Sequence, residues 1–508
     1  MLRIARLPAV VTIVAALAAP AAATAAPGNP LARYAADTWH SMAAMVNPGT
    51  GLPSDNINGA LDPASRAKYT SPTNIGMYLW STVGARHVGL ISSGEAVRRV
   101  EQTLTTVATL RRHPASGQFY NWYDPATGEV LRTWPVDGST VFPFLSSVDN
   151  GWLASGLLMV ANDLPAVSGQ ARSLLSTMDF GFYYDPAARG ADFPAGLIRG
   201  GFWDEAPPGC SVVGNYRGRG PDVWYTCHHY GSFNTEPRIA SYIGIAMGQI
   251  PAAHYFAGWR TFPATCDWSW QEQQPVGHDA TYLGVPVFEG TYAYQGVRVV
   301  PTWGGSMFEA LMVPLVVPEE TWGPRSWGRN HPLYVQAQIA HGLHDAQYGY
   351  WGFSPSNNPS GGYREWGVDA IGMDTNGYTS DEQRTPVDFG YGDCPGRPPV
   401  PPPASYGEGV VTPHASFLAL RYAPAAALSN LDNLRRDFDA YGPGGFYDAI
   451  NVTTGAVSKA YLALDQGMVM AALSNALTGD TLRKAFTRGP VSALRQVIAM
   501  EDWSDVRG

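Results

Sequence analysis

The sequence predicts an all-α protein, an (α/α)6 toroid with six inner and six outer helices and with long loops at one mouth. Three observations predict it: six segments share a polar or glycine-rich start followed by a small, apolar helix, amphipathic helices lie between them, and no Ser/Pro linker divides the chain. A helix that is apolar nearly all round is buried, whereas an amphipathic helix meets water on one face. Alternation of the two kinds therefore indicates an inner and an outer ring.

The six buried segments are spread over most of the chain. They are 71–85, 146–161, 234–248, 304–317, 409–422 and 462–477. Small residues such as Gly244 and Ala246 let inner helices approach one another closely. If the six helices run in the same direction, their polar starts gather at one end, where free N–H groups carry partial positive charge.

Amphipathic stretches separate the buried ones. Examples are 93–112, 329–346 and 429–442, whose apolar residues recur at helical spacing. An irregular helical protein of several domains is the alternative. The recurring polar starts favour one toroidal domain over residues 27–508, with the proline run at 397–405 crossing the mouth rather than separating two domains.

The first 26 residues are expected to be a secretory signal peptide. Arg3 and Arg6 precede an apolar run over 7–22, and small residues follow up to Ala26, which is the order typical of a cleaved signal. The run is shorter than the ~20 apolar residues that a membrane span needs. We therefore expect a secreted, extracellular protein without a membrane span once the signal is removed.

Composition restricts the classes of partner. Charged residues make up only 15% of the chain, aromatic residues reach 12%, and the net charge is −9. An acidic chain argues against nucleic acid and anionic membrane as partners. Many aromatic rings with few charges suit flat neutral ligands such as sugars, although a large aromatic core explains some of the rings. We expect a monomer that binds a polysaccharide or oligosaccharide.

The chain has four cysteines, Cys210, Cys227, Cys266 and Cys394. An even number in an exported protein favours disulfides. Cys210 and Cys227 bracket one Gly/Pro-rich loop and are predicted to pair, which leaves Cys266 for Cys394, although three connectivities exist. No CxxC or CxxH spacing indicates zinc, and the acidic run 374–382 does not match an EF-hand loop. No metal and no cofactor are expected.

The polar starts of the inner helices are expected to line a shared funnel. Their members are Asn74, Asp149, Asn150, Glu236, Arg238, Glu309, His414, Asp465 and Gln466. Several carboxylates with little positive charge and many aromatic rings fit cleavage of glycosidic bonds. That reaction needs one protonated carboxyl group to donate to the leaving oxygen and one ionised carboxylate as nucleophile or base.

Glu236 is the predicted acid. It lies among Phe233, Pro237 and Ile239, which favour a raised pKa, while Arg238 and the helix start oppose this. The candidate bases each have a structural alternative, because Asp149 can cap its helix, Glu309 can pair with a buried arginine, and Glu408 lies in a glycine-rich turn. A Ser-His-Asp triad is disfavoured because no G-x-S-x-G segment is present.

The buried segments also resemble a known family. Blocks such as "SSVDNGWLASGLL", "EPRIASYIGIAMG", "WGGSMFEALMVPLVV", "GVVTPHASFLALRY" and "LDQGMVMAALSN" occur in family order between about residues 70 and 477. They resemble the glycoamylase-like domain shared by bacterial endo-β-1,2-glucanases and the C-terminal region of cyclic β-1,2-glucan synthases. The resemblance implies an (α/α)6 toroid that acts on a β-linked glucan, with β-1,2 as the leading linkage. The hydrolases of the family resemble inverting enzymes, which implies a pair of carboxyl groups ~6.5–9.5 Å apart.

The resemblance assigns roles to individual residues. It maps the family's acid onto Glu236, the acidic residue before its V-x-P-x-A-S block onto Glu408, and that of its S-x-V-D block onto Asp149. Sugar-binding residues are expected in or beside the shared blocks, namely Trp122, Trp303, Trp351, Ser354, Tyr363 and Arg364.

The chain also departs from the family pattern. Ser354-Pro355-Ser356 stands where the synthases carry Ser-Glu-Ser, so a retaining mechanism that uses that glutamate is not available. Glu408 stands where the hydrolases carry Asp, and segments 194–229 and 373–404 are expected insertions beside the mouth. The alternatives are therefore a hydrolase of another polysaccharide such as arabinan, a lyase with a more basic cleft, and a non-catalytic carbohydrate-binding envelope protein.

Overall fold

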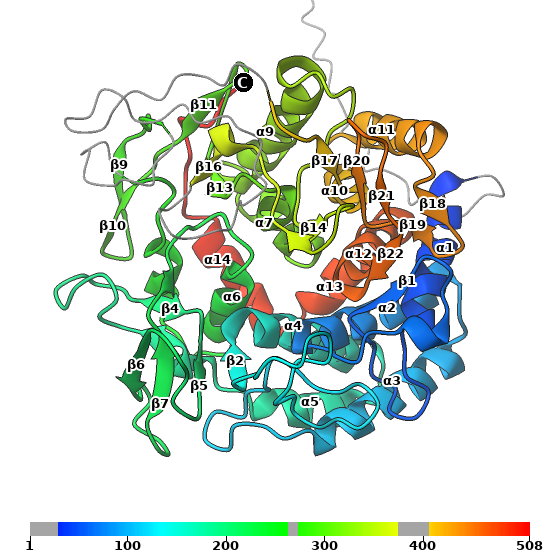
Figure 1. Cartoon of the computed structure of the whole chain (residues 1–508). Coiled ribbons are helices and arrows are strands. Elements are labelled where there is room, and N and C mark those ends of the chain that lie inside the picture. The colour runs from blue at the N-terminus through cyan, green and yellow to red at the C-terminus, as the bar shows by residue number, and fades with distance from the viewer. Residues whose placement is uncertain (1–28, 263–272, 374–405) are drawn as a thin grey trace, which may run out of the picture.

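A computed structural model describes residues 29–262, 273–373 and 406–508. Six inner helices surround the centre of the molecule (Figure 1). They are α2 (Pro72–Val88), α4 (Ser147–Asp163), α6 (Arg238–Ala246), α7 (Met307–Leu311), α10 (Pro413–Ala419) and α12 (Ala463–Thr478). The predicted toroid is confirmed. The expected signal peptide, Cys266, Cys394 and segment 374–405 lie outside the described residues.

Neighbouring inner helices pack directly against one another. Helix α2 packs on α4 and α12, α4 packs on α6, and α10 packs on α7 and α12. Between α6 and α7, the Arg238 guanidinium donates to the carbonyl oxygens of Glu309 at 2.9 Å and Ala310 at 2.7 Å. At the crossing of α2 and α4, a Cβ on Gly76 would lie 2.4 Å from the carbonyl oxygen of Trp152. Only glycine permits this approach.

Three inner helices are shorter than the sequence predicted. Pro237 immediately precedes α6, and Pro413 is the first residue of α10, where its missing N–H costs nothing. Segment 304–317 is divided into α7 and a short 3-10 helix over Val313–Leu315. Pro314 explains the division because it removes an N–H and crowds the preceding turn.

The other helices of the described residues pack around the six inner ones. They are α1 (Pro30–Ala44), α3 (Ser93–Thr109), α5 (Ser168–Ser176), α8 (Glu319–Trp322), α9 (Trp327–Ala340), α11 (Pro424–Asp437), α13 (Thr481–Phe486) and α14 (Leu494–Ile498). Helix α13 packs against α2, α4 and α12. Helix α3 matches the predicted 93–112, whereas α11 begins at Pro424, ahead of the predicted 429. Beside α6 lie a 3-10 helix over Ala252–Phe256 and α14, so the outer ring is least regular there.

Short antiparallel strands build much of the mouth. One sheet has the order β2 (Phe144–Ser146), β5 (Gly201–Trp203), β7 (Val223–Thr226) and β6 (Ser211–Gly214), and another has β3 (Tyr184–Asp185), β4 (Leu197–Arg199) and β8 (His229–Tyr230). The predicted disulfide Cys210–Cys227 is present and joins the ends of β6 and β7, where Ser211 pairs with Thr226. The expected insertion 194–229 is thus a disulfide-linked sheet.

The remaining strands form small ladders. They are β1 (Asn56–Asn58) with β22 (Ala460–Leu462), β9 (Asp279–Tyr282) with β10 (Val285–Phe288), β11 (Tyr292–Tyr294) with β12 (Val297–Val299), β13 (Thr302–Trp303) with β16 (Gly372–Met373), β14 (Ser356–Asn357) with β15 (Tyr363–Arg364), β18 (Tyr441–Gly442) with β19 (Gly445–Phe446), and β17 (Val410–Val411) with β20 (Ala449–Asn451) and β21 (Val457–Ser458). Across the described ranges, no helix has the length and apolar character that crossing a membrane requires.

Candidate active site

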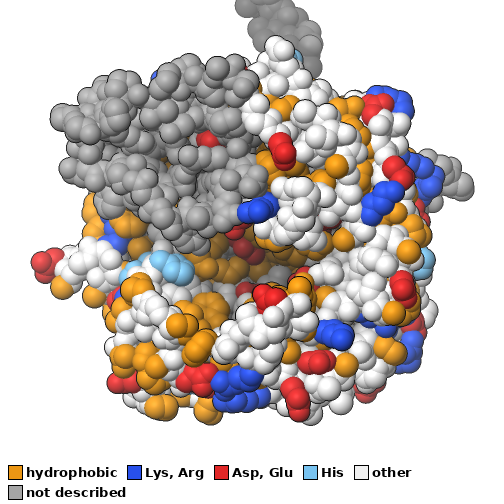
Figure 2. Space-filling model, viewed as in Figure 1, with side chains coloured by type: hydrophobic (Ala, Val, Ile, Leu, Met, Phe, Trp, Pro, Cys, Tyr) orange, Lys and Arg blue, Asp and Glu red, His pale blue; other side chains and the backbone are white. Residues whose placement is uncertain are grey.

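A cavity of about 870 Å³ opens at the end of the ring where the inner helices begin. The same face is hollowed near its centre, where hydrophobic side chains lie beside acidic ones (Figure 2). Five of the six polar starts contribute to the lining, with Asn74 from α2, Asp149 from α4, Glu236 ahead of α6, Glu309 from α7 and Leu464 from α12. The predicted gathering of helix starts at one end is confirmed for these five.

Carboxylates dominate the charge of the cavity. They are Asp55, Asp149, Glu236, Glu309 and Glu365. Among the described residues that line the cavity, none is Lys or Arg. Such a lining disfavours an acidic sugar as ligand, because like charges repel in a site of low dielectric.

The surroundings of Glu236 favour its neutral form. The indole N–H of Trp152 donates to its Oε1 at 2.5 Å, and its own backbone N–H donates to Oε2 of Glu309 at 2.6 Å. Burial and then the neighbouring Glu309 and Asp149 raise the pKa of Glu236 well above its usual range. Arg238 opposes this rise, as expected, but its charge is the last of these influences in size.

Arg238 lies inside the wall rather than in the cavity. It is 4% exposed, and its guanidinium donates to both carboxylate oxygens of Glu319, at 2.8 and 3.0 Å, and lies over the ring of Trp327. Although burial of Glu319 opposes ionisation, Arg238 and then His331 lower the pKa of Glu319 to about 2. Arg238 therefore does not reach the cavity, and the predicted contact with sugar does not fit this structure.

Glu309 supports the start of α6. Its carboxylate accepts from the Thr235 hydroxyl and the Glu236 N–H, while Ser306 caps α7 by accepting from the Glu309 N–H at 3.1 Å. Burial raises the pKa of Glu309, and the hydrogen bonds oppose that rise. The structural alternative for Glu309 was pairing with a buried arginine, Arg238 or Arg364; Arg238 donates to the Glu309 backbone carbonyl at 2.9 Å, and its carboxylate partner is Glu319.

Asp149 presents its carboxylate to the cavity. The helix cap that the sequence allowed for it is supplied by Ser146, whose hydroxyl accepts from the Asp149 N–H at 3.2 Å. The Thr73 hydroxyl donates to Oδ1 at 2.7 Å, and the Asn121 amide, turned with its nitrogen inward, donates to Oδ2 at 2.7 Å. Burial raises the pKa of Asp149, and the hydroxyl donors oppose the rise.

Asp55 is a second carboxylate beside Asp149. It accepts from the side-chain amides of Asn74 at 2.9 Å and Asn56 at 3.0 Å. Burial raises its pKa, and the charge of Asp149 adds to that rise. The two aspartates therefore influence each other's ionisation.

Aromatic rings gather on the Asp55 side of the cavity. Asn56 donates to the Tyr69 hydroxyl at 3.1 Å, and the Tyr69 ring lies 4.5 Å from Trp134 and 5.6 Å from Trp122. Trp134 comes from a turn-rich hairpin whose tip is exposed, with Val136 74% exposed. All three rings line the cavity, where partly open rings can stack on a sugar.

The structure brings seven of the predicted site residues to the cavity. They are Asn74, Trp122, Asp149, Glu236, Trp303, Glu309 and Tyr363. The other predicted residues do not line it, namely Asn150, Arg238, Trp351, Ser354, Arg364, Glu408, His414, Asp465 and Gln466.

The predicted residues outside the cavity have other surroundings. Asn150 bonds both backbone groups of Phe119, at 2.8 and 2.9 Å, and Gln466 accepts from Ser41. Glu408 is exposed in the turn ahead of β17, so the geometry does not bring the mapped base to Glu236. His414 and Asp465 lie together with Asp448 in a buried group that could hold a metal ion.

Sequence reasoning missed several lining residues. They are Asp55, Tyr69, Trp134, His228, His229, Trp259 and Glu365. All lie on loops or short strands rather than at helix starts. The available signal was composition, since tryptophan in the turn-rich stretch "RTWPVDGST" is unusual for a solvent-exposed loop.

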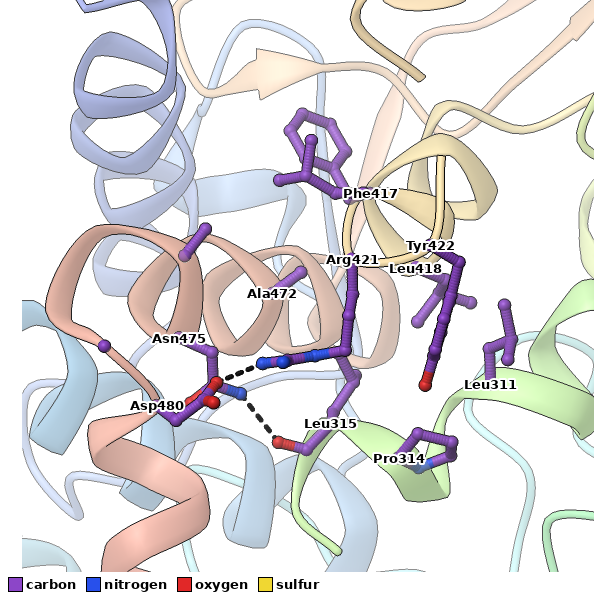
Figure 3. A pocket seen from close by; sticks show the side chains of 13 residues that line it. Leu311, Pro314, Leu315, Phe417, Leu418, Arg421, Tyr422, Ala472, Asn475 and Asp480 are labelled. Atoms are coloured by element: carbon purple, nitrogen blue, oxygen red, sulfur yellow. Dashed lines mark hydrogen bonds and ion pairs between the residues drawn. The ribbon is translucent and has the colours of Figure 1, made fainter. Parts of the chain in front are cut away.

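A smaller cavity lies among the C-terminal ends of α10 and α12 (Figure 3). Its volume is about 230 Å³, and Leu311, Pro314 and Leu315 contribute to its apolar lining. Asp480 is the carboxylate there, and it is paired with Arg421. Without a second carboxylate in its lining, this cavity does not support acid–base catalysis.

Comparisons with known proteins agree on one group. The family model described as glycoamylase, putative glucoamylase, matches residues 278–490, and a model of a protein of unknown function, DUF3131, matches residues 33–181. The cyclic β-(1,2)-glucan synthase NdvB of Rhizobium meliloti is 24% identical over 92% of this chain. The chain spans only 18% of the length of that relative.

Solved structures share the fold. The endo-β-1,2-glucanase of Chitinophaga pinensis, in complex with sophorotriose and glucose, is 16% identical with a TM-score of 0.61, over 92% of this chain and 97% of that one. A putative glucoamylase of Bacteroides uniformis is 15% identical with a TM-score of 0.64, over 92% of this chain and 96% of that one. A mutant endo-β-1,2-glucanase of Talaromyces funiculosus, in complex with β-1,2-glucan, is 13% identical with a TM-score of 0.63, over 95% of this chain and 91% of that one. The resemblance read from the sequence is thereby confirmed: residues 278–490 match the glycoamylase model, and the chain shares the (α/α)6 toroid fold of these structures.

Proposed function

We propose that the protein is a secreted glycoside hydrolase that cleaves a β-linked glucan, acting as an endo-β-1,2-glucanase with inversion of the anomeric carbon. The observation that carries the proposal is Glu236, a carboxyl group whose surroundings raise its pKa, in a cavity that holds a separate carboxylate on Asp149. Two carboxyl groups whose environments separate their pKa values are what acid–base cleavage requires.

Glu236 acts as the general acid. Trp152 occupies Oε1 as a donor, which leaves Oε2 to carry the proton toward the glycosidic oxygen. As the bond to the leaving sugar breaks, that oxygen takes the proton and Glu236 becomes ionised. Burial and neighbouring carboxylates otherwise disfavour ionisation of Glu236. Ionisation becomes favourable in this step because the leaving group accepts the proton.

Asp149 acts as the general base. It takes a proton from a water that attacks the anomeric carbon on the face opposite the leaving group, which inverts the configuration. Burial raises the pKa of Asp149, and hydrogen bonds from Thr73 and Asn121 oppose that rise by favouring its ionised form. Glu309 is less suited because its carboxylate already accepts from Thr235 and Glu236, and Glu408 is outside the cavity.

The proposed substrate is a neutral glucan chain. A lining without Lys or Arg among its described residues and with Trp122, Trp134, Trp259 and Trp303 suits uncharged sugar rings. Two of the solved relatives are named endo-β-1,2-glucanases, which supports the linkage. Secretion rests on the N-terminal segment 1–26.

The test is release of reducing ends by residues 27–508 from linear β-1,2-glucan, β-1,3-glucan and arabinan. Glu236→Gln is the matched blank, since it keeps the shape of the side chain and removes the acid. We expect oligosaccharides from β-1,2-glucan alone and a loss of about 10²–10⁴-fold in kcat for the variant. The first product formed should be the α-anomer by NMR.

Other outcomes would redirect the proposal. Release from arabinan alone, abolished by Glu236→Gln, would support Glu236 as the acid but show that the substrate is arabinan. The loops at the mouth would then determine substrate specificity. If no reducing ends are released from any of the three polysaccharides, and wild type and variant bind sugar equally, the protein is a carbohydrate-binding protein rather than a hydrolase.

A further inference from the structure

Three buried side chains converge close to Asn357, which lines the cavity. His414 lies in the first turn of α10, Asp448 directly precedes β20, and Asp465 lies in the first turn of α12. They are 3%, 2% and 2% exposed. One imidazole nitrogen and one carboxylate oxygen from each aspartate all lie within 4.8 Å of one another, although the three residues are far apart in the chain.

The inner atoms of this group lack hydrogen-bond donors. Nδ1 of His414, Oδ1 of Asp448 and both carboxylate oxygens of Asp465 are buried without a hydrogen-bond partner among the described residues. Nδ1 of His414 lies 3.4 Å from Oδ1 of Asp465, and the carboxyl groups of Asp448 and Asp465 lie close enough to share a proton. Buried polar atoms are nearly always satisfied, so four such atoms in one place indicate something that binds between them.

The outer atoms of the same side chains are fixed. The Asn357 N–H donates to Oδ2 of Asp448 at 2.7 Å, and Nε2 of His414 contacts the hydroxyls of Ser354 at 3.0 Å and Thr412 at 3.2 Å. Outer hydrogen bonds that aim inner donor atoms at one point are the usual surroundings of metal ligands.

The charge of the group also favours a bound cation. No described Lys or Arg forms an ion pair with Asp448 or Asp465. Two adjacent buried carboxylates cost free energy unless a cation or a proton lies between them. A divalent cation neutralises both at once.

We propose that His414, Asp448 and Asp465 bind one divalent cation that accepts mixed imidazole and carboxylate ligands, with Zn²⁺ or Mn²⁺ as the best match. The cation joins the starts of α10 and α12 to strand β20 and, through Asp448, holds the backbone of Asn357, which lines the cavity. Its role is structural: it fixes the position of Asn357 in the cavity lining. The sequence alone predicted no metal, because the three ligands share no local motif.

The rival state is a proton shared by Asp448 and Asp465 with no cation present. Untagged protein treated with EDTA and desalted is titrated with ZnCl₂, MnCl₂ or CaCl₂, while bound metal is measured by mass spectrometry and unfolding by calorimetry. We expect one equivalent of Zn²⁺ or Mn²⁺ and a Tm that rises until that equivalent is bound, as ligand linkage requires. No bound metal and an unchanged Tm with all three salts would overturn the proposal and favour the shared proton.

Variants assign the metal to this group. Asp465→Asn and His414→Gln should lose both the bound equivalent and the metal-dependent rise in Tm. The control is Asp163→Asn, which alters a buried carboxylate paired with Arg86 and His87 outside this group and should keep the metal. Metal retained by Asp465→Asn and His414→Gln would place it elsewhere and refute the assignment. The titration of the wild type decides whether a cation binds even if a variant does not fold, and none of these readouts depends on hydrolytic activity.

Discussion

The indole N–H of Trp152 donates a hydrogen bond of 2.5 Å to Oε1 of Glu236. Trp152 is fully buried on α4, and Glu236 stands at the start of α6, so the bond joins two adjacent inner helices at the cavity. An indole nitrogen can only donate. It therefore orients the carboxyl group in both protonation states and favours the ionised one, which partly offsets the effect of burial.

The first prediction concerns pH. Because the acid must be protonated, activity should be lost as pH rises through the pKa of Glu236, and burial places that pKa well above the usual value of about 4.5. Trp152→Phe removes a bond that favours the charged form, so it should raise the pKa further and move the alkaline limb of kcat/KM to higher pH. Profiles of both proteins check this, and a limb that moves to lower pH would contradict it.

The second prediction separates the candidate bases. Asp149→Asn should lower kcat by about 10²–10⁴-fold, since it removes a general base while keeping size and shape. Glu408→Gln is the control, because Glu408 is exposed and outside the cavity, and its kcat should stay near that of the wild type. A large loss for Glu408→Gln and a small one for Asp149→Asn in a steady-state assay would instead identify Glu408 as the base, as the family pattern assigns.

The third prediction concerns the aromatic rings beside Asp55. Trp134→Ala should raise KM for long oligosaccharides by about 2- to 10-fold, as expected for one aromatic contact worth about 0.5–1.5 kcal/mol. Short substrates that do not reach Trp134 should be unaffected. Val136→Ala, on the exposed tip of the same hairpin, is the matched control. Equal losses for all substrate lengths would indicate a folding defect instead of a sugar contact.

The fourth prediction concerns stability. Glu319→Gln leaves Arg238 buried without its charged partner and should lower the free energy of unfolding by about 3–5 kcal/mol. The depressed pKa of Glu319, about 2, means that its contribution is present above about pH 4.5 and is lost as pH falls toward 2. Denaturant unfolding between pH 3 and 7 measures both effects.

A surface pair provides the comparison for that prediction. Asp439→Asn removes the exposed partner of Lys459 and should leave the unfolding midpoint unchanged, because water screens exposed charges. A loss for Asp439→Asn as large as that for Glu319→Gln would contradict the distinction between buried and exposed pairs.

Sequence alone predicted the ring and the presence of Glu236 at its mouth. The alternation of buried and amphipathic helices is a local pattern, and the six apolar segments that it identified include all six inner helices, even where Pro314 divides one of them. Glu236 was identified because its position ahead of a buried helix is also local. The pairing of Cys210 with Cys227 followed from their closeness in the chain.

Tertiary structure decided which side chains meet. Asp55 and Trp134 reach the cavity on loops, and Glu408 is exposed outside its lining, because loop paths depend on packing against distant segments rather than on periodicity. His414 and Asp465 were expected at the mouth, yet closure of the ring buries them with Asp448. A helix pattern specifies which face is buried, whereas the contacts made on that face depend on the other helices of the ring.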